Sequence, residues 1–182
     1  LVAFYCLAGH TQRRITDPAT ILAIWKNIAN NCAEAGTVLF SVAHTADPRE
    51  CSPFWPIKLS GHVAGHAMGF LQTPFRRDFY FDPRIESKID VDISLQVLAK
   101  RRFLWVDTRY AFSTQPFLQT PGGSAGVRTS GVETNDLRLL QEKYGAGVVK
   151  VSHFDTTAHK SRKVHIRVNV QRHSKIPVRR WQ

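Results

Sequence analysis

The feature that most constrains the fold is an amphipathic helix pattern between two apolar segments near the N-terminus. Thr16-Asp17-Pro18 supplies a capping residue and a proline where such a helix would begin, and Gly36 supplies a stop. The apolar segments 1–8 and 38–42 on either side predict strands, so the chain opens with strand, helix and strand. The apolar helix residues recur at steps of three and four and share one face: Ile21, Ile24, Trp25, Ile28 and Cys32.

The next part of the chain predicts an irregular segment and a hairpin. Residues 45–62 are rich in turn formers and should form no long element. Residues 66–71 and 78–82 flank the segment 73–77, which predicts two strands joined by a basic tip.

Two further strands and a helix are expected after residue 88. Residues 89–97 alternate apolar and polar side chains, the pattern of a strand with one buried face, and residues 103–106 are its expected partner. The segment 119–131 contains four glycines and predicts a flexible loop. A helical pattern over 134–144, closed by Gly145, follows it.

Two more strands are predicted in the C-terminal part of the chain, at 148–151 and 164–170. Successive side chains of a strand point to opposite faces, so the second strand has one apolar face of Val and Ile. Its other face carries His165, Arg167 and Asn169. Arg binds phosphates and Asn bonds base edges, so this face suits single-stranded or looped RNA.

Positive charge is concentrated in the second half of the chain. The formal net charge is +11 at pH 7, and residues 92–182 carry sixteen Lys and Arg against six Asp and Glu. No acidic residue follows Asp155. A basic block attracts a polyanion, and nucleic acid is the commonest one in a cell. The residues predicted to bind RNA are Arg162, Lys163, His165, Arg167, Asn169, Arg172, Lys175, Arg179 and Arg180, with Arg76 and Arg77 as a second site. A solvated basic tail without a dedicated ligand is the alternative interpretation.

Length and composition predict one folded domain over residues 1–182 that ends in a basic segment, 156–182. A chain of 182 residues with 43% hydrophobic residues can bury a core and is not disordered. No segment approaches the roughly 18 consecutive apolar residues of a membrane span. We therefore expect no membrane association.

Cysteine and histidine usage predicts neither a disulfide framework nor a metal site. The chain has an odd number of cysteines, Cys6, Cys32 and Cys51, and no Cys-x-x-Cys motif. This favours free thiols in a reducing cytoplasm. His62 and His66 are four residues apart, but glycines surround them and no acidic residue lies between them, so zinc is not expected. No other cofactor is predicted.

The order of the expected elements resembles the ferredoxin-like domains of the RAMP superfamily. The segment 148–170 is similar to the closing segment of subtype I-F CRISPR repeat-processing endoribonucleases, and Ser152 lies where that family keeps a serine near its active site. The resemblance implies an α+β fold with a ferredoxin-like antiparallel sheet and two main helices. It also implies an RNA-binding subunit of a ribonucleoprotein complex, with other protein subunits as partners.

The sequence departs from this family at a catalytic position. The family carries a general-base histidine in its first helix, where this chain has Asn30, Asn31 and Cys32. His10, just before the helix, is the nearby substitute. Cleavage through the RNA 2′-hydroxyl needs a positioned base, so metal-independent endoribonuclease activity stays open.

Two other functions are compatible with the sequence. His66 and Asp82 are sixteen residues apart in an arrangement that resembles papain-like effector proteases and deamidases, for which Cys6 or Cys51 would be the nucleophile. A viral coat protein would place the basic segment against packaged nucleic acid.

Overall fold

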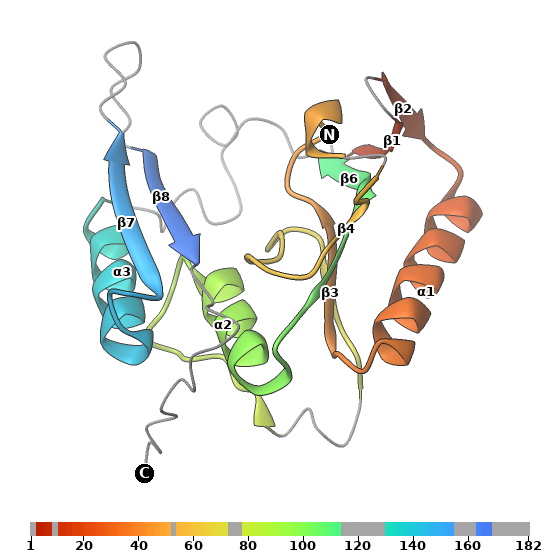
Figure 1. Cartoon of the computed structure of the whole chain (residues 1–182). Coiled ribbons are helices and arrows are strands. Elements are labelled where there is room, and N and C mark those ends of the chain that lie inside the picture. Colours follow the sequence, from red (N-terminus) through yellow and green to blue (C-terminus); the bar gives the residue numbers. More distant parts are fainter. Residues whose placement is uncertain are drawn as a thin grey trace.

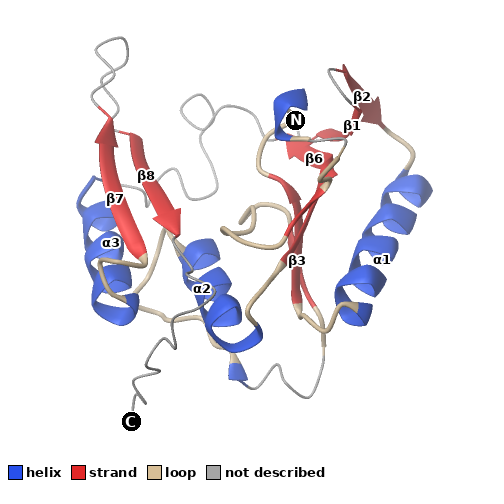
Figure 2. Ribbon diagram, in the orientation of Figure 1, coloured by secondary structure: helices blue, strands red, loops and turns tan. Residues whose placement is uncertain are grey.

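The computed structural model describes residues 3–8, 11–51, 54–72, 78–113, 130–154 and 163–168. These residues form an α+β fold with a larger mixed sheet, a two-stranded sheet, three α-helices and a short 3-10 helix, η1 (Pro48–Glu50) (Figure 1, Figure 2). The α-helices are α1 (Pro18–Glu34), α2 (Ile89–Arg101) and α3 (Ser130–Tyr144). The strands of the larger sheet are β1 (Ala3–Ala8), β2 (Thr11–Ile15), β3 (Leu39–Ala43), β4 (Ile57–Lys58), β5 (Met68–Phe70) and β6 (Trp105–Ser113). The two-stranded sheet consists of β7 (Val149–Phe154) and β8 (Lys163–Val168). Within these ranges no helix is both long and apolar enough to cross a membrane.

The larger sheet has the order β2-β1-β6-β3-β5, and the short β4 also pairs with β6. Strands β3 and β6 run parallel, and the other pairs are antiparallel. The α+β class is confirmed. The expected antiparallel sheet with two main helices is wrong in two respects, because one strand pair is parallel and the described residues form a third helix.

Helices α1 and α2 cover opposite faces of this sheet (Figure 2). On one face, Ile28 and Cys32 of α1 pack against Phe4 and Phe40. On the other, Ile93 of α2 packs in a cluster with residues of β3 and β6. The core therefore lies in two layers, one on each side of the sheet.

Helix α1 forms where local signals predict it. The Asp17 carboxylate accepts a hydrogen bond from Thr20 N (2.8 Å), and Pro18 follows at the first helical position. Gly36 ends the segment at φ +84°, a conformation that glycine adopts readily. The flanking strands are confirmed as β1 and β3. Strand β2 was not predicted, because residues 11–14 are all polar and show no alternation of apolar and polar side chains. In the structure all four are exposed.

Residues 89–97, predicted to be a strand, form most of α2. Every residue from Val91 to Leu98 is buried, including the polar positions that the alternation assigned to water. Ser94 Oγ donates to Asp90 O (2.6 Å), and Gln96 Nε2 donates to Asp92 Oδ2 (2.8 Å). A helix buried on all sides shows no solvent-facing stripe, so the helical period is absent.

The predicted hairpin over 66–82 is also wrong. Strand β5 pairs with β3, and residues 79–82 form no strand. Phe79 is instead buried against Phe70, with ring centroids 5.5 Å apart. The segment 103–106 likewise lacks its expected partner, because α2 is a helix and β6 pairs with β1, β3 and β4.

The C-terminal part follows the prediction where it is described. Helix α3 ends before Gly145, which has φ +90°, and β7 and β8 pair antiparallel. Leu140 of α3 and Val149 of β7 pack in one cluster with Leu95 of α2. The two-stranded sheet is thereby anchored to the rest of the fold through α3 (Figure 1).

Candidate functional site

The β7–β8 pair brings predicted RNA-binding positions into register. Lys150 pairs with Arg167, Ser152 with His165, and Phe154 with Lys163. Directly opposed positions of an antiparallel pair belong to the same face. Val149 is buried whereas its neighbour Lys150, which belongs to this face, is exposed. We call the six paired positions the hairpin face.

The structure describes only part of the predicted site. Lys163, His165 and Arg167 lie on β8, and Ser152 lies across from His165 on β7. The remaining predicted residues lie outside the described ranges: His10, Arg76, Arg77, Arg162, Asn169, Arg172, Lys175, Arg179 and Arg180. Most of the glycine-rich segment 119–131 also lies outside them.

Charge is nearly balanced in the part of the chain before the hairpin. Residues 1–144 hold sixteen Lys and Arg against thirteen Asp and Glu, and seven of these cations pair with carboxylates between residues 47 and 143. The segment 145–182 contains nine Lys and Arg against the single acid Asp155. The surplus charge is therefore carried by the segment that contains β7 and β8, and few carboxylates of that segment can neutralise it.

Large aromatic side chains are exposed at two other places. Phe54 and Trp55 are 84% and 78% exposed before β4, and Tyr80 and Phe81 are 52% and 60% exposed before α2. Exposed aromatic rings can stack on unpaired bases.

The residues of the papain-like interpretation each have other partners. The His66 ring contacts the Phe112 carbonyl oxygen (Nε2 to O, 3.0 Å). The Asp82 carboxylate accepts from Arg84 (Nη2 to Oδ2, 2.7 Å) and lies 3.5 Å from Lys143 Nζ. None of these contacts aligns His66 with Asp82.

The alternative nucleophiles of that interpretation also lie in the sheet and its core. Cys6 is an interior position of β1, paired with residues of both β2 and β6. Cys51 is buried in a cluster with Leu7, Ala43 and Ala111.

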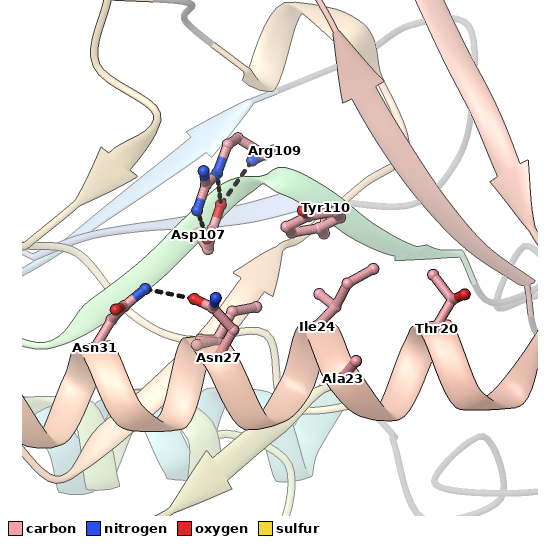
Figure 3. A pocket seen from close by; sticks show the side chains of 9 residues that line it. Thr20, Ala23, Ile24, Asn27, Asn31, Asp107, Arg109 and Tyr110 are labelled. Atoms are coloured by element: carbon pink, nitrogen blue, oxygen red, sulfur yellow. Dashed lines mark hydrogen bonds and ion pairs between the residues drawn. The ribbon is translucent and has the colours of Figure 1, made fainter.

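A pocket of about 610 Å³ lies between α1 and β6. Figure 3 shows Asn27 and Asn31 on α1 facing Asp107 and Arg109 on β6. Apolar side chains of α1 and the Tyr110 ring complete the walls. The lining residues are Thr20, Ala23, Ile24, Asn27, Ile28, Asn31, Asp107, Arg109 and Tyr110.

The charged residues of the pocket neutralise one another. Arg109 Nε donates to Asp107 Oδ1 (2.9 Å) and Nη2 donates to Oδ2 (2.7 Å), while Asp107 is fully buried. The hydrogen bond to Asp107 raises the pKa of Arg109, so the guanidinium stays charged and fixed in place. Burial raises the pKa of Tyr110, which keeps its hydroxyl neutral.

Sequence reasoning missed this pocket because its walls are far apart along the chain. Asn27 and Asn31 are four residues apart on α1, whereas Asp107 and Tyr110 follow about 80 residues later. The available signal was the pair of amides one turn apart beside the apolar face of the helix. That spacing places both side chains on one flank of α1.

The described residues contain no group of three or more His, Cys, Asp or Glu that could hold a metal ion. No protein-family model, curated protein or solved structure matches the chain.

Proposed function

We propose that this protein binds single-stranded RNA through the hairpin face and the basic segment that surrounds it. The observation that carries the proposal is the separation of charge along the chain. Residues 1–144 hold sixteen Lys and Arg against thirteen Asp and Glu, and seven of these cations form ion pairs with protein carboxylates, whereas the segment 145–182 holds nine Lys and Arg against one Asp.

The register of the hairpin supports contacts with a phosphate backbone. Lys150 and Arg167 are opposed, Lys163 shares their face, and neighbouring strands lie about 4.8 Å apart. The Ser152–His165 pair separates Lys163 from Lys150 and Arg167, so the three cations are spread along one face, which suits a chain of phosphates better than a single small anion. The exposed aromatic rings at 54–55 and 80–81 add surfaces on which bases could stack.

The RAMP resemblance supplies a more specific form of the proposal. It implies a ferredoxin-like relationship and a place in a cytoplasmic ribonucleoprotein with other protein subunits. Two catalytic candidates, His10 and Ser152, belong to this more specific proposal. Ser152 lies within the described residues, where it pairs with His165 of β8. Cleavage of the bound RNA is not part of the proposal.

Fluorescence anisotropy with a labelled 20-nucleotide RNA, measured over a range of salt concentrations, tests RNA binding. The triple variant K150A/K163A/R167A should bind more weakly. Its log–log dependence on salt should also be shallower by about 2, since each neutralised phosphate contributes roughly 0.7. The weaker binding follows because fewer counterions are released.

A matched control removes the same charge from positions that face carboxylates. Arg49, Lys58 and Arg138 each form an exposed ion pair. The triple variant R49A/K58A/R138A should retain the wild-type salt dependence. Equal losses in the two triple variants, or binding that salt does not weaken, would contradict the proposed surface.

A further inference from the structure

The pocket between α1 and β6 has the chemistry of a site for a neutral planar ring. Its volume of about 610 Å³ lies within the range of small-molecule sites, roughly 300–1,000 Å³. The ion pair of Asp107 and Arg109 leaves it without net charge, so a free phosphate gains little inside it. Ile24 and Ile28 provide apolar walls, and Tyr110 provides an aromatic one.

Two amides provide a donor and an acceptor in this pocket. Asn31 Nδ2 donates to Asn27 Oδ1 (2.8 Å), which orients both side chains. Asn27 Nδ2 and Asn31 Oδ1 have no hydrogen-bond partner among the described residues. An adjacent donor and acceptor match the edge of a nucleobase, which also presents donors and acceptors in one plane.

An irregularity in β6 lets Asp107 and Tyr110 face the same pocket. The register between β3 and β6 shifts after Val42, so that Val42 pairs with Asp107 whereas Ala43 pairs with Ala111. A bulge of this kind changes which side chains point to one face. Asp107 and Tyr110, three residues apart, therefore both line the pocket.

A cation lies in line with the pocket at the edge of the sheet. Cys6 of β1 pairs with Tyr110 on one side and with Arg13 of β2 on the other, so these three positions share a face. Two strand spacings separate Arg13 from Tyr110, roughly 10 Å. Arg13 is exposed and forms no ion pair with any described residue. Its neighbour Arg14 has the same charge and exposure but belongs to the opposite face.

We propose that this pocket binds one nucleotide, with the base between α1 and β6 and the phosphate near Arg13. The nucleotide is either an unstacked residue of the RNA strand or a free nucleoside monophosphate. The first source rests on the proposed RNA-binding function, whereas the second does not.

Ligand-observed NMR with the four nucleosides and their 5′-monophosphates tests the site directly. Ala23→Phe fills the pocket from an exposed position of α1 and should abolish binding of both ligand types. Asn31→Ala removes the acceptor amide and should weaken binding about tenfold without filling the pocket. Arg13→Ala should weaken the monophosphates and leave the nucleosides unchanged, whereas Arg14→Ala should change neither.

The RNA arm compares 20-nucleotide strands of a single base with an abasic strand of equal length. Ala23→Phe should lower the affinity for base-bearing strands and leave the abasic strand and the salt dependence unchanged. Circular dichroism verifies that each variant is folded, and Asn31→Ala replaces Ala23→Phe if the latter is not.

The outcomes separate this inference from the proposed function. If RNA binding depends on salt but neither base identity nor the pocket variants affect it, and no nucleotide binds, the pocket inference is wrong and RNA binding stands. If monophosphates bind in a pocket-dependent manner but RNA does not, the pocket is a free-nucleotide site and the RNA proposal is wrong. If neither ligand binds, both are wrong.

Discussion

Lys143 Nζ on α3 lies 2.8 Å from Asp92 Oδ1 on α2, and the two side chains are only 9% and 2% exposed. The same carboxylate accepts hydrogen bonds from Tyr144 Oη (2.6 Å) and Gln96 Nε2 (2.8 Å). A buried charge is tolerated when it is paired and fully hydrogen-bonded. This network therefore fixes α3, and with it the β7–β8 pair, against α2.

Removing the ammonium group should destabilise the fold strongly. Lys143→Met keeps the apolar stem but leaves Asp92 buried without its cation, which should lower the free energy of unfolding by about 3–5 kcal/mol. Urea unfolding measures the change. Arg138→Met breaks an exposed pair on the same helix and should lower the free energy by about 0–1 kcal/mol. Similar losses of unfolding free energy in both variants would show that the buried pair stabilises the fold no more than the exposed pair.

Asp136 of α3 should be a tertiary cap for α2. Its buried carboxylate accepts hydrogen bonds from Ser87 N (2.6 Å) and Lys88 N (3.2 Å), while Lys88 itself makes no side-chain cap. Asp136→Asn introduces a donor among these donors and should lower the free energy of unfolding by about 1–3 kcal/mol. Thermal unfolding checks this value. The exposed neighbour variant Asn135→Ala should stay within about 0.5 kcal/mol of wild type.

Gly69 should tolerate no side chain. Gly69 pairs with Phe40 across β5 and β3, and a Cβ on it would overlap the Phe40 ring. Gly69→Ala should therefore lower the free energy of unfolding by about 1–3 kcal/mol. Gly147→Ala, where no atom lies within 4 Å of the added carbon, is the matched control for chemical denaturation. The double variant G69A/F40L should recover part of the loss; a double variant as unstable as G69A alone would exclude the overlap as its cause.

Asp82 should make stability depend on pH in the acid range. Hydrogen bonds from Arg84 hold the pKa of Asp82 well below its ordinary value, and the charge of Lys143 acts in the same direction against burial. A depressed pKa means that the unfolded chain takes up the proton first as pH falls. The stabilisation is fully present above the unfolded pKa of about 3.9 and is lost progressively as the pH falls from there toward the depressed folded-state pKa. The difference in urea midpoint between wild type and Asp82→Asn should be largest near pH 7 and should shrink steadily as the pH falls below about 4; a constant difference would contradict this.

The three free cysteines should react in the order of their exposure. Burial raises the pKa of the Cys32 thiol to about 12, and Cys51 is also buried, whereas Cys6 is partly exposed. Iodoacetamide needs an accessible thiolate, so at pH 7.5 only Cys6 should be alkylated before unfolding. Peptide mass spectrometry after timed quenching identifies the modified residues. Rapid alkylation of Cys51 in the folded protein would instead favour an activated thiol.

Elements that depend on local signals were predictable from the sequence. Helix α1 is specified by the Asp17 cap, Pro18 and the apolar stripe, all within a few residues of the backbone that they control. The ends at Gly36 and Gly145 follow from the positive φ angles that glycine accepts. Two strands at 148–151 and 164–170 were likewise predicted, the second from the alternation of Val and Ile with polar residues, whereas their antiparallel pairing was seen only in the structure.

One candidate site can be located from the sequence, whereas the other requires the tertiary structure. The charge surplus after residue 144 is visible in the sequence alone. The pocket is not, because it requires Asn27 and Tyr110 to be adjacent and β6 to change register beside β3.

The sequence by itself determined where charge accumulates, where α1 begins and ends, and that helices and strands coexist. Only the tertiary structure decided that residues 89–101 form a helix, because contacts on every side bury its polar residues and erase the period that would identify it. The parallel pairing of β3 with β6 also depends on the tertiary structure. Local propensities act over one or two turns of chain, whereas burial and strand partners depend on residues that are distant in sequence.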